Sequence, residues 1–128
     1  MQKRLLVPAR VRQIPRQFSW IDQRLVRDNR LLGAPADTWA LYLFLLTVAD
    51  ARGLSYYADP SIGRQLSVGP EPLARARQGL IDAGLIAYQA PLYQVLALDP
   101  EPAPPARGGA GTLTAIGEVL RRTLGEAP

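Results

Sequence analysis

The chain has 128 residues, 48% of them hydrophobic, which is enough for one compact domain with tails but not for two full domains. It contains no cysteine and no histidine, so disulfides, thiolate metal sites, a cysteine nucleophile and the commonest general base are all excluded. Lys and Arg outnumber Asp and Glu by 15 to 11. These features predict a non-enzymatic protein without cofactor or metal, and with an anionic partner.

The positive charge is concentrated near the start of the chain. Residues 1–30 carry eight basic residues against two aspartates, a net charge of +6, so the remainder sums to −2. A basic arm suits a polyanion, because each phosphate that it neutralises releases counterions. Arg10, Arg12 and Arg16 are the predicted phosphate contacts. The alternative is a solvated tail whose arginines reflect GC-rich coding, since only one of the fifteen basic residues is Lys.

No membrane segment is expected. The N-terminal residues lack the apolar stretch of a signal peptide, and the longest apolar run, residues 41–49 with Thr47 inside it, is too short to cross a bilayer. The lack of cysteine fits a reducing compartment. We therefore expect a soluble cytoplasmic protein, associated with the nucleoid if its partner is DNA.

Residues 1–34 are predicted to form a basic N-terminal extension. Pro8 and Pro15 favour an extended backbone over residues 1–17. Ser19 is a candidate N-cap for a short helix over residues 20–28, with Asp22 in its first turn.

The next helix is predicted to begin at Pro35 or Ala36 and to end at Gly53. Its side chains are apolar almost all round, so it must be covered on more than one side. A three-helix core would cover one face. The other would be covered either by residues 18–26 or by a second subunit, which is the reason to consider a homodimer. The tryptophans, Trp20 and Trp39, are expected in the core, although either could fill a partner's pocket.

The remaining elements of residues 35–98 alternate between short strands and helices. Turn and cap residues predict a strand over 54–57, a helix over 60–66 capped by Asp59, a helix over 71–83 ended by Gly84, and strands over 85–88 and 93–98. Tyr56, Tyr57, Tyr88 and Tyr93 are expected to pack on the sheet.

Two segments follow this domain. Residues 99–111 are rich in Pro and Gly and are predicted to be a linker. Residues 112–128 have helical apolar spacing, and Ile116, Leu120 and Leu124 would form the apolar face. That helix could fold back on the domain, but the linker favours docking on a protein partner.

The order helix, strand, helix, helix and hairpin is that of a winged helix-turn-helix. The predicted fold class is therefore α+β, mainly α, with a three-helix core and a small antiparallel β-wing. In the helix over 71–83, an inward stripe would leave Arg75, Gln78 and Asp82 outward, with Ala74 and Gly79 keeping that face shallow. The inward stripe would consist of Leu73, Ala76, Leu80, Ile81 and Gly84. Arginine pairs with guanine and glutamine with adenine in the major groove.

Residues 62–88 resemble the winged-helix family of bacterial regulators and replication initiators, on the residues Arg75-Ala76, Leu80 and Ala83-Gly84-Leu85-Ile86. Residues 41–45 and 49–54 are similar to the N-terminal domains of phage and plasmid replication initiators. More loosely, the whole chain, including residues 18–22 and 116–122, resembles small accessory proteins of bacterial mobile elements. The resemblance implies binding of double-stranded DNA in replication, transcription regulation or a mobile element, with Arg75 as an outward contact.

The sequence departs from this family at Gly69-Pro70-Glu71-Pro72, where regulators usually carry Ser and Thr. Glu71 would repel phosphate unless it accepts a hydrogen bond from cytosine. Arg77 replaces a buried Leu, and is expected to reach phosphate or to pair with Asp82 or Glu71. The predicted DNA contacts are Arg75, Gln78, Arg77, Arg64 and Ser61, together with the three arginines of the arm. A protein-binding or scaffolding winged helix is the alternative, favoured by the uncharged wing.

Overall fold

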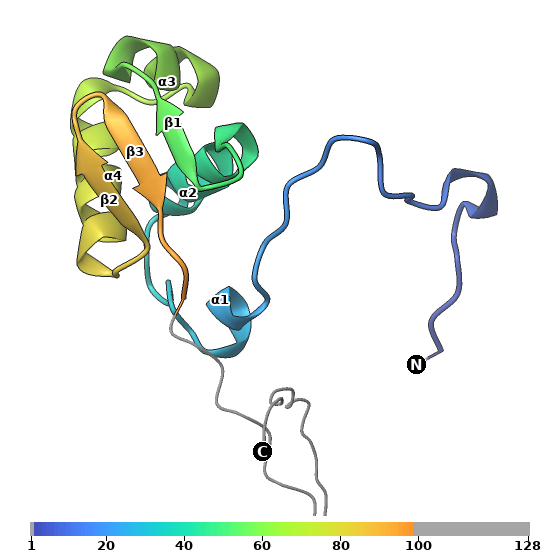
Figure 1. The fold of residues 1–128 in the computed structure, drawn as a ribbon. Coiled ribbons are helices and arrows are strands. Elements are labelled where there is room, and N and C mark those ends of the chain that lie inside the picture. The colour runs from blue at the N-terminus through green and yellow to red at the C-terminus, as the bar shows by residue number, and fades with distance from the viewer. Residues whose placement is uncertain (1, 99–128) are drawn as a thin grey trace, which may run out of the picture. The chain divides into compact units, whose positions relative to one another are not determined.

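The computed structural model describes residues 2–98 (Figure 1). They contain a short 3-10 helix η1 (Pro8–Arg10), helices α1 (Arg24–Arg27), α2 (Ala36–Val48), α3 (Asp59–Leu66) and α4 (Pro70–Asp82), and strands β1 (Leu54–Tyr56), β2 (Ile86–Gln89) and β3 (Leu92–Val95). This part is α+β and mainly helical, as predicted. The predicted linker 99–111 and C-terminal helix 112–128, including Ile116, Leu120 and Leu124, lie outside the described residues.

Helix α2 begins where the sequence predicts and ends earlier. The Thr38 N–H donates to the carbonyl of Pro35 at 3.0 Å, which closes the first turn. The helix stops at Val48 rather than continuing to Gly53. The reason is Asp50, whose carboxylate accepts hydrogen bonds from the backbone N–H groups of Arg52 at 2.8 Å and Leu54 at 2.9 Å. This side chain offers the backbone an alternative to helix and turns the chain into β1.

The predicted helix over residues 20–28 is wrong in length, because only α1 forms. Ser19 does not cap it; its hydroxyl donates to the carbonyl of Thr47 at 3.4 Å. The N-cap is Gln23, which makes no side-chain cap, and the residue before it, Asp22, accepts a hydrogen bond from the Arg24 N–H at 2.9 Å and pairs with the Arg24 guanidinium at 2.8 Å. The hydrogen bonds from Arg24, side chain first and backbone second, lower the pKa of Asp22 to about 2.

The three strands form one antiparallel sheet in the order β1-β3-β2, so β3 is central (Figure 1). Tyr93 on β3 lies opposite Ser55 of β1 and Tyr88 of β2. Strand β3 ends at Val95, three residues earlier than predicted. Beyond it the Leu96 N–H still donates to the Leu85 carbonyl, at 2.9 Å.

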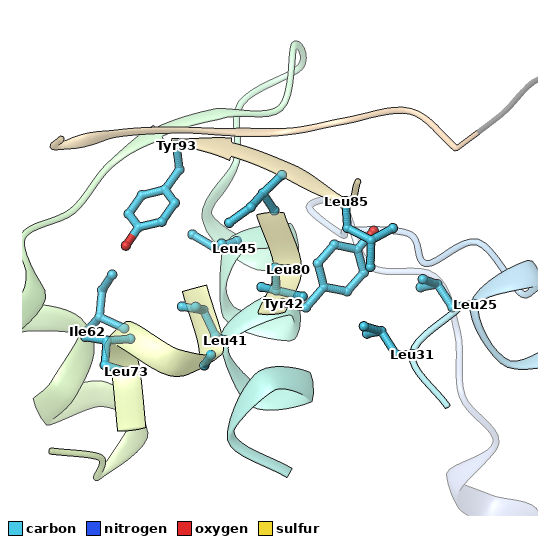
Figure 2. Close-up of a cluster of buried hydrophobic side chains, with 12 residues drawn as sticks. Leu25, Leu31, Leu41, Tyr42, Leu45, Ile62, Leu73, Leu80, Leu85 and Tyr93 are labelled. Atoms are coloured by element: carbon cyan, nitrogen blue, oxygen red, sulfur yellow. The ribbon is translucent and has the colours of Figure 1, made fainter. Parts of the chain in front are cut away.

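The core lies between α2, α4 and the sheet, and Figure 2 shows its buried side chains. Leu41 of α2, Ile62 of α3 and Leu73 of α4 meet at one end. At the other end, Leu25 and Leu31 are buried near Tyr42. Residues 25–31 therefore cover part of the second face of α2, whereas most of the predicted cover, residues 18–26, does not: Phe18, Trp20, Ile21 and Val26 are exposed and only Leu25 is buried.

That cover is incomplete, and several apolar side chains remain exposed. Leu43 on α2 is 54% exposed and Trp20 is 74% exposed, so the prediction that Trp20 is a core residue is wrong. Trp39 is half-buried against the core, as expected. Within residues 2–98, no helix combines the length and the apolar character needed to cross a membrane.

Helices α3 and α4 are joined by a short turn. Ser67 ends α3 in the left-handed conformation, with φ of 57°, and the Val68 N–H donates to the carbonyl of Gly63 at 3.1 Å. Asp59 is the first residue of α3 and makes no side-chain cap, which differs from its predicted role. Helix α4 ends near the predicted position, with Gly84 at φ of +73° directly after the C-cap.

Candidate nucleic-acid interface

The outward face of α4 carries the two residues predicted to read bases. Arg75 is 70% exposed at its side chain, and its guanidinium lies 3.4 Å from the carboxylate of Glu71, one turn earlier. The Gln78 amide donates to the carboxylate of Asp82 at 2.8 Å. Arg75 and Gln78 are thus each held by an acidic neighbour four residues away on an open helix face. Such exposed pairs are weak, so both groups are free to exchange partners.

The inward face of α4 fixes how this surface is presented. Leu73, Ala76 and Leu80 are buried in the core, as predicted, and Ile81 is half-buried beside them. The prediction that Gly84 belongs to this inward stripe is wrong, because Gly84 lies beyond the C-cap of α4 and is exposed. The prediction that Gly79 lies on the outward face is wrong. A Cβ at this position would lie 3.6 Å from the side chain of Thr38 in α2, so Gly79 lies at the contact between the two helices.

Arg77 has a different environment from the one predicted. Its guanidinium donates to the hydroxyl of Tyr93 at 2.9 Å, pairs with the carboxylate of Asp59, and lies 4.4 Å from the centre of the Tyr88 ring. The expected pairing with Asp82 or Glu71 is therefore wrong. The side chain is only 13% exposed and joins α3, α4 and the sheet, which leaves it poorly placed to reach phosphate. The feature of the sequence that could have indicated this position of Arg77 is the pair of tyrosines, Tyr88 and Tyr93, which lie opposite each other on neighbouring strands. Aromatic rings of that kind attract an arginine side chain.

The β2–β3 hairpin does not present Tyr93 to solvent. Tyr93 is completely buried, and burial raises the pKa of its hydroxyl while the hydrogen bond from Arg77 opposes that shift. Tyr93 packs against Tyr88 on the sheet, with ring centroids 4.6 Å apart, as expected. The tip consists of Ala90 and Pro91, which are exposed and uncharged.

Helix α3 contributes one exposed cation. Arg64 is exposed and lines a depression between α3 and the start of α4, together with Val68 and Leu73. Ser61 is half-buried in the first turn of α3. Of the predicted contacts on these two helices, Arg64, Arg75 and Gln78 are thus open to a large partner, whereas Ser61 is less accessible.

The N-terminal arm, defined as residues 2–17, has no regular structure apart from η1. Arg10, Arg12 and Arg16 are all exposed, as a phosphate-binding arm requires. The arm contains five basic residues and no acidic one. It also exposes apolar side chains, among them Leu6 and Ile14, each at least 80% exposed. A basic arm that binds only phosphate does not require those apolar groups.

The surface around α4 is balanced in charge, in contrast to the arm. Residues 59–95 contain three arginines and three carboxylates, and the hairpin of β2 and β3 contains no charged residue. The first turn of α4 has Pro70 and Pro72 at positions that would otherwise donate backbone N–H groups. Helix α4 therefore offers side chains rather than backbone amides to a partner.

Three of the aspartates in residues 2–98 make local structural contacts. In residues 2–98, no group of three or more Asp or Glu side chains is arranged to hold a metal ion. Asp22 and Asp50 accept backbone hydrogen bonds, and Asp59 pairs with Arg77.

Comparison with protein-family models, with curated proteins and with solved structures found no match to this chain.

Proposed function

We propose that residues 35–98 form a winged-helix domain that binds duplex DNA, with α4 as the recognition helix in the major groove. The arm would follow the phosphates next to the groove. Binding would be non-enzymatic and would serve replication, transcription regulation or a mobile element. A homodimer would place two copies of α4 on a palindromic or repeated site.

The order of the elements supports the winged-helix assignment. Helix α2 is followed by β1, then by the α3–α4 pair, then by the β2–β3 hairpin. The first strand pairs with the last, so the sheet has the order β1-β3-β2. This arrangement packs α4 against α2 by its apolar stripe and leaves its opposite face to solvent. A helix presented in this way fits the width of the major groove.

The observation that carries the proposal is the open face with Arg75 and Gln78. Both side chains lie on a helix anchored by a fully buried stripe, so their positions are fixed by the core although the groups themselves are exposed. Arginine can donate two hydrogen bonds to guanine, and glutamine can pair with adenine. Their present acidic partners are weak competitors for such contacts.

A selection of the full chain on random duplexes at two salt concentrations tests this proposal. The wild type is expected to enrich a motif at both concentrations, with lower affinity at the higher one. Arg75→Ala is expected to relax the base preference at one position of the enriched site. It should weaken binding to the duplex that carries the preferred base there by about 1–3 kcal/mol. A wild type that enriches no motif, or an Arg75→Ala variant with unchanged affinity and preference, would remove α4 as the reading element.

A second candidate is a protein-binding winged helix, favoured by two observations. The surface of residues 59–95 has no net positive charge. In addition, ten of the twelve exposed large hydrophobic side chains fall within residues 5–32. Apolar surface of that kind marks protein contacts more often than DNA contacts. Binding of a partner that persists at high salt, without affinity for duplex, would favour this candidate.

A further inference from the structure

We infer that Glu71 is a specificity-determining residue of α4 that accepts a hydrogen bond from a cytosine amino group, next to a guanine read by Arg75. This inference rests on the proposed function and adds the bases that α4 prefers. It assigns a purpose to an acidic residue on a surface that has to approach a polyanion.

The position of Glu71 is the first step of the argument. Its side chain is 91% exposed, at the second residue of α4 and on the same face as Arg75. Recognition helices contact base edges with their N-terminal residues, so this is the part of α4 that would lie deepest in the groove. A carboxylate placed there meets base edges, where the donors are cytosine N4 and adenine N6. Cytosine N4 is the better partner, because adenine N6 lies beside the N7 acceptor, whose lone pair repels a carboxylate.

The second step is that the start of α4 is unsuited to phosphate. Pro70 and Pro72 lack N–H groups, and the N–H of Leu73 is already bonded to the carbonyl of Gly69 at 3.1 Å. Among the first four residues, only the Glu71 N–H remains, beside its own negative side chain. Phosphate is therefore disfavoured at this turn, and a base edge with a hydrogen-bond donor is the ligand that fits.

The third step is the spacing of the two side chains. Glu71 and Arg75 are four residues apart, about 6 Å along the helix axis, and base pairs are stacked about 3.4 Å apart. The two groups therefore cover adjacent or next-but-one base pairs. In free protein they contact each other at 3.4 Å, and on DNA each would exchange this contact for a base. Guanine or thymine at the Glu71 position would leave the carboxylate unpaired beside the duplex, and adenine would place its N7 acceptor next to it.

In this proposal, the arm and α4 contribute differently to DNA binding. The five basic residues of the arm supply attraction to any duplex. Glu71 and Asp82 lower the affinity of α4 for duplexes that do not present the right bases. The arm then determines the overall affinity of the chain for DNA, and α4 determines which sequence it prefers.

The test compares Glu71→Gln and Glu71→Ala with a matched control, Asp28→Asn, which removes one exposed carboxylate outside α4. Random-duplex selection on each full chain is followed by affinity measurements on single-base variants of the enriched site. The wild type and Asp28→Asn are expected to prefer cytosine about tenfold at one position. Glu71→Gln is expected to shift that preference to adenine, and Glu71→Ala to abolish it.

Two contrary results are distinguishable. The inference is wrong if both Glu71 variants keep the wild-type base preference and, like the Asp28→Asn control, differ from the wild type only by tighter binding to every duplex. Glu71 would then be only a repelling charge, and the proposed function would stand. If the wild type has no salt-dependent affinity for duplex, the proposed function fails and this inference fails with it.

Discussion

Gly53 links α2 to the sheet at a point with no room for a side chain. Its φ is +85°, and a Cβ would lie 2.6 Å from the carbonyl oxygen of Val95. The Val95 N–H also donates to the Gly53 carbonyl at 2.8 Å, so neither backbone can move away without losing that bond. The close approach, together with the positive φ, makes this position specific for glycine.

We therefore predict that Gly53→Ala is much more destabilising than Gly84→Ala. Gly84 has a similar φ of +73°, but nothing lies within 4 Å of its Cβ position. The Gly84 variant should lose about 1 kcal/mol from backbone strain alone. The Gly53 variant should lose at least about 2 kcal/mol more, because a backbone clash is added. Urea denaturation of both variants measures the difference, and equal losses would contradict this account of the β1–β3 junction.

Arg77 connects α4 to the sheet through Tyr93 and to α3 through Asp59. Replacing it with Met removes the hydrogen bond to Tyr93 and the pair with Asp59 but keeps an unbranched side chain. We predict that Arg77→Met lowers the free energy of unfolding by about 2–3 kcal/mol, since a buried hydroxyl loses its partner. Arg75→Met, on the exposed face, should change it by less than about 0.5 kcal/mol. Similar denaturation midpoints for the two variants would show that the Arg77 cluster contributes little.

At the scale of elements, the turn between α2 and β1 predicts a pH dependence. Hydrogen bonds from the backbone N–H groups of Leu54 and Arg52 lower the pKa of Asp50 below its ordinary value of 3.8. A carboxyl with a lowered pKa in the folded state stabilises the fold above the unfolded-state pKa. That contribution is lost as pH falls through the folded-state value.

Thermal unfolding of Asp50→Asn tests this prediction, because an amide oxygen can still accept both hydrogen bonds but does not titrate. The melting temperature of the wild type should fall more steeply than that of the variant below about pH 4. Between pH 5 and 7 the difference between the two should be constant, since the chain has no histidine. Parallel curves down to pH 2 would mean that the Asp50 hydrogen bonds do not depend on its charge.

The helices of the domain could be predicted from the sequence because their start and stop signals are local. Pro35 marks the start of α2 and Gly84 follows the end of α4, and the apolar spacing of α4 places three buried residues correctly. The predictions that failed depend on contacts between residues far apart in the chain. Arg77 reaches Asp59 and Tyr93, which are 18 and 16 residues away, and helical spacing alone carries no information on either.

The same reasoning explains the errors near the N-terminus. Ser19 has the residue type of an N-cap, but its hydroxyl bonds the end of α2, 28 residues later. Trp20 has the residue type of a core residue and yet lies exposed. At the candidate site, the exposure of Arg75 and Gln78 followed from periodicity, whereas their pairing with Glu71 and Asp82 required side-chain conformations.

At the scale of the whole molecule, charge divides the chain into a basic arm and a balanced domain. If the arm binds phosphates, Arg12→Ala should weaken binding to all duplexes about equally. It should also reduce the slope of log affinity against log salt by about 0.9, the value for one lost phosphate contact. Arg75→Ala, measured on the same duplexes, should mainly change the preference among sequences and should change this salt slope less. Identical slopes for wild type and Arg12→Ala would show that the arm is a solvated tail.

The surface used by the full chain can be located most directly by recording its backbone amide NMR spectrum during titration with a duplex that it enriches. The largest shifts are expected along the exposed side of α4, at Glu71, Arg75 and Gln78, with further shifts at the arginines of the arm. Shifts confined to the exposed apolar residues around Trp20 and Leu43, or no shifts at all, would contradict recognition of DNA by α4.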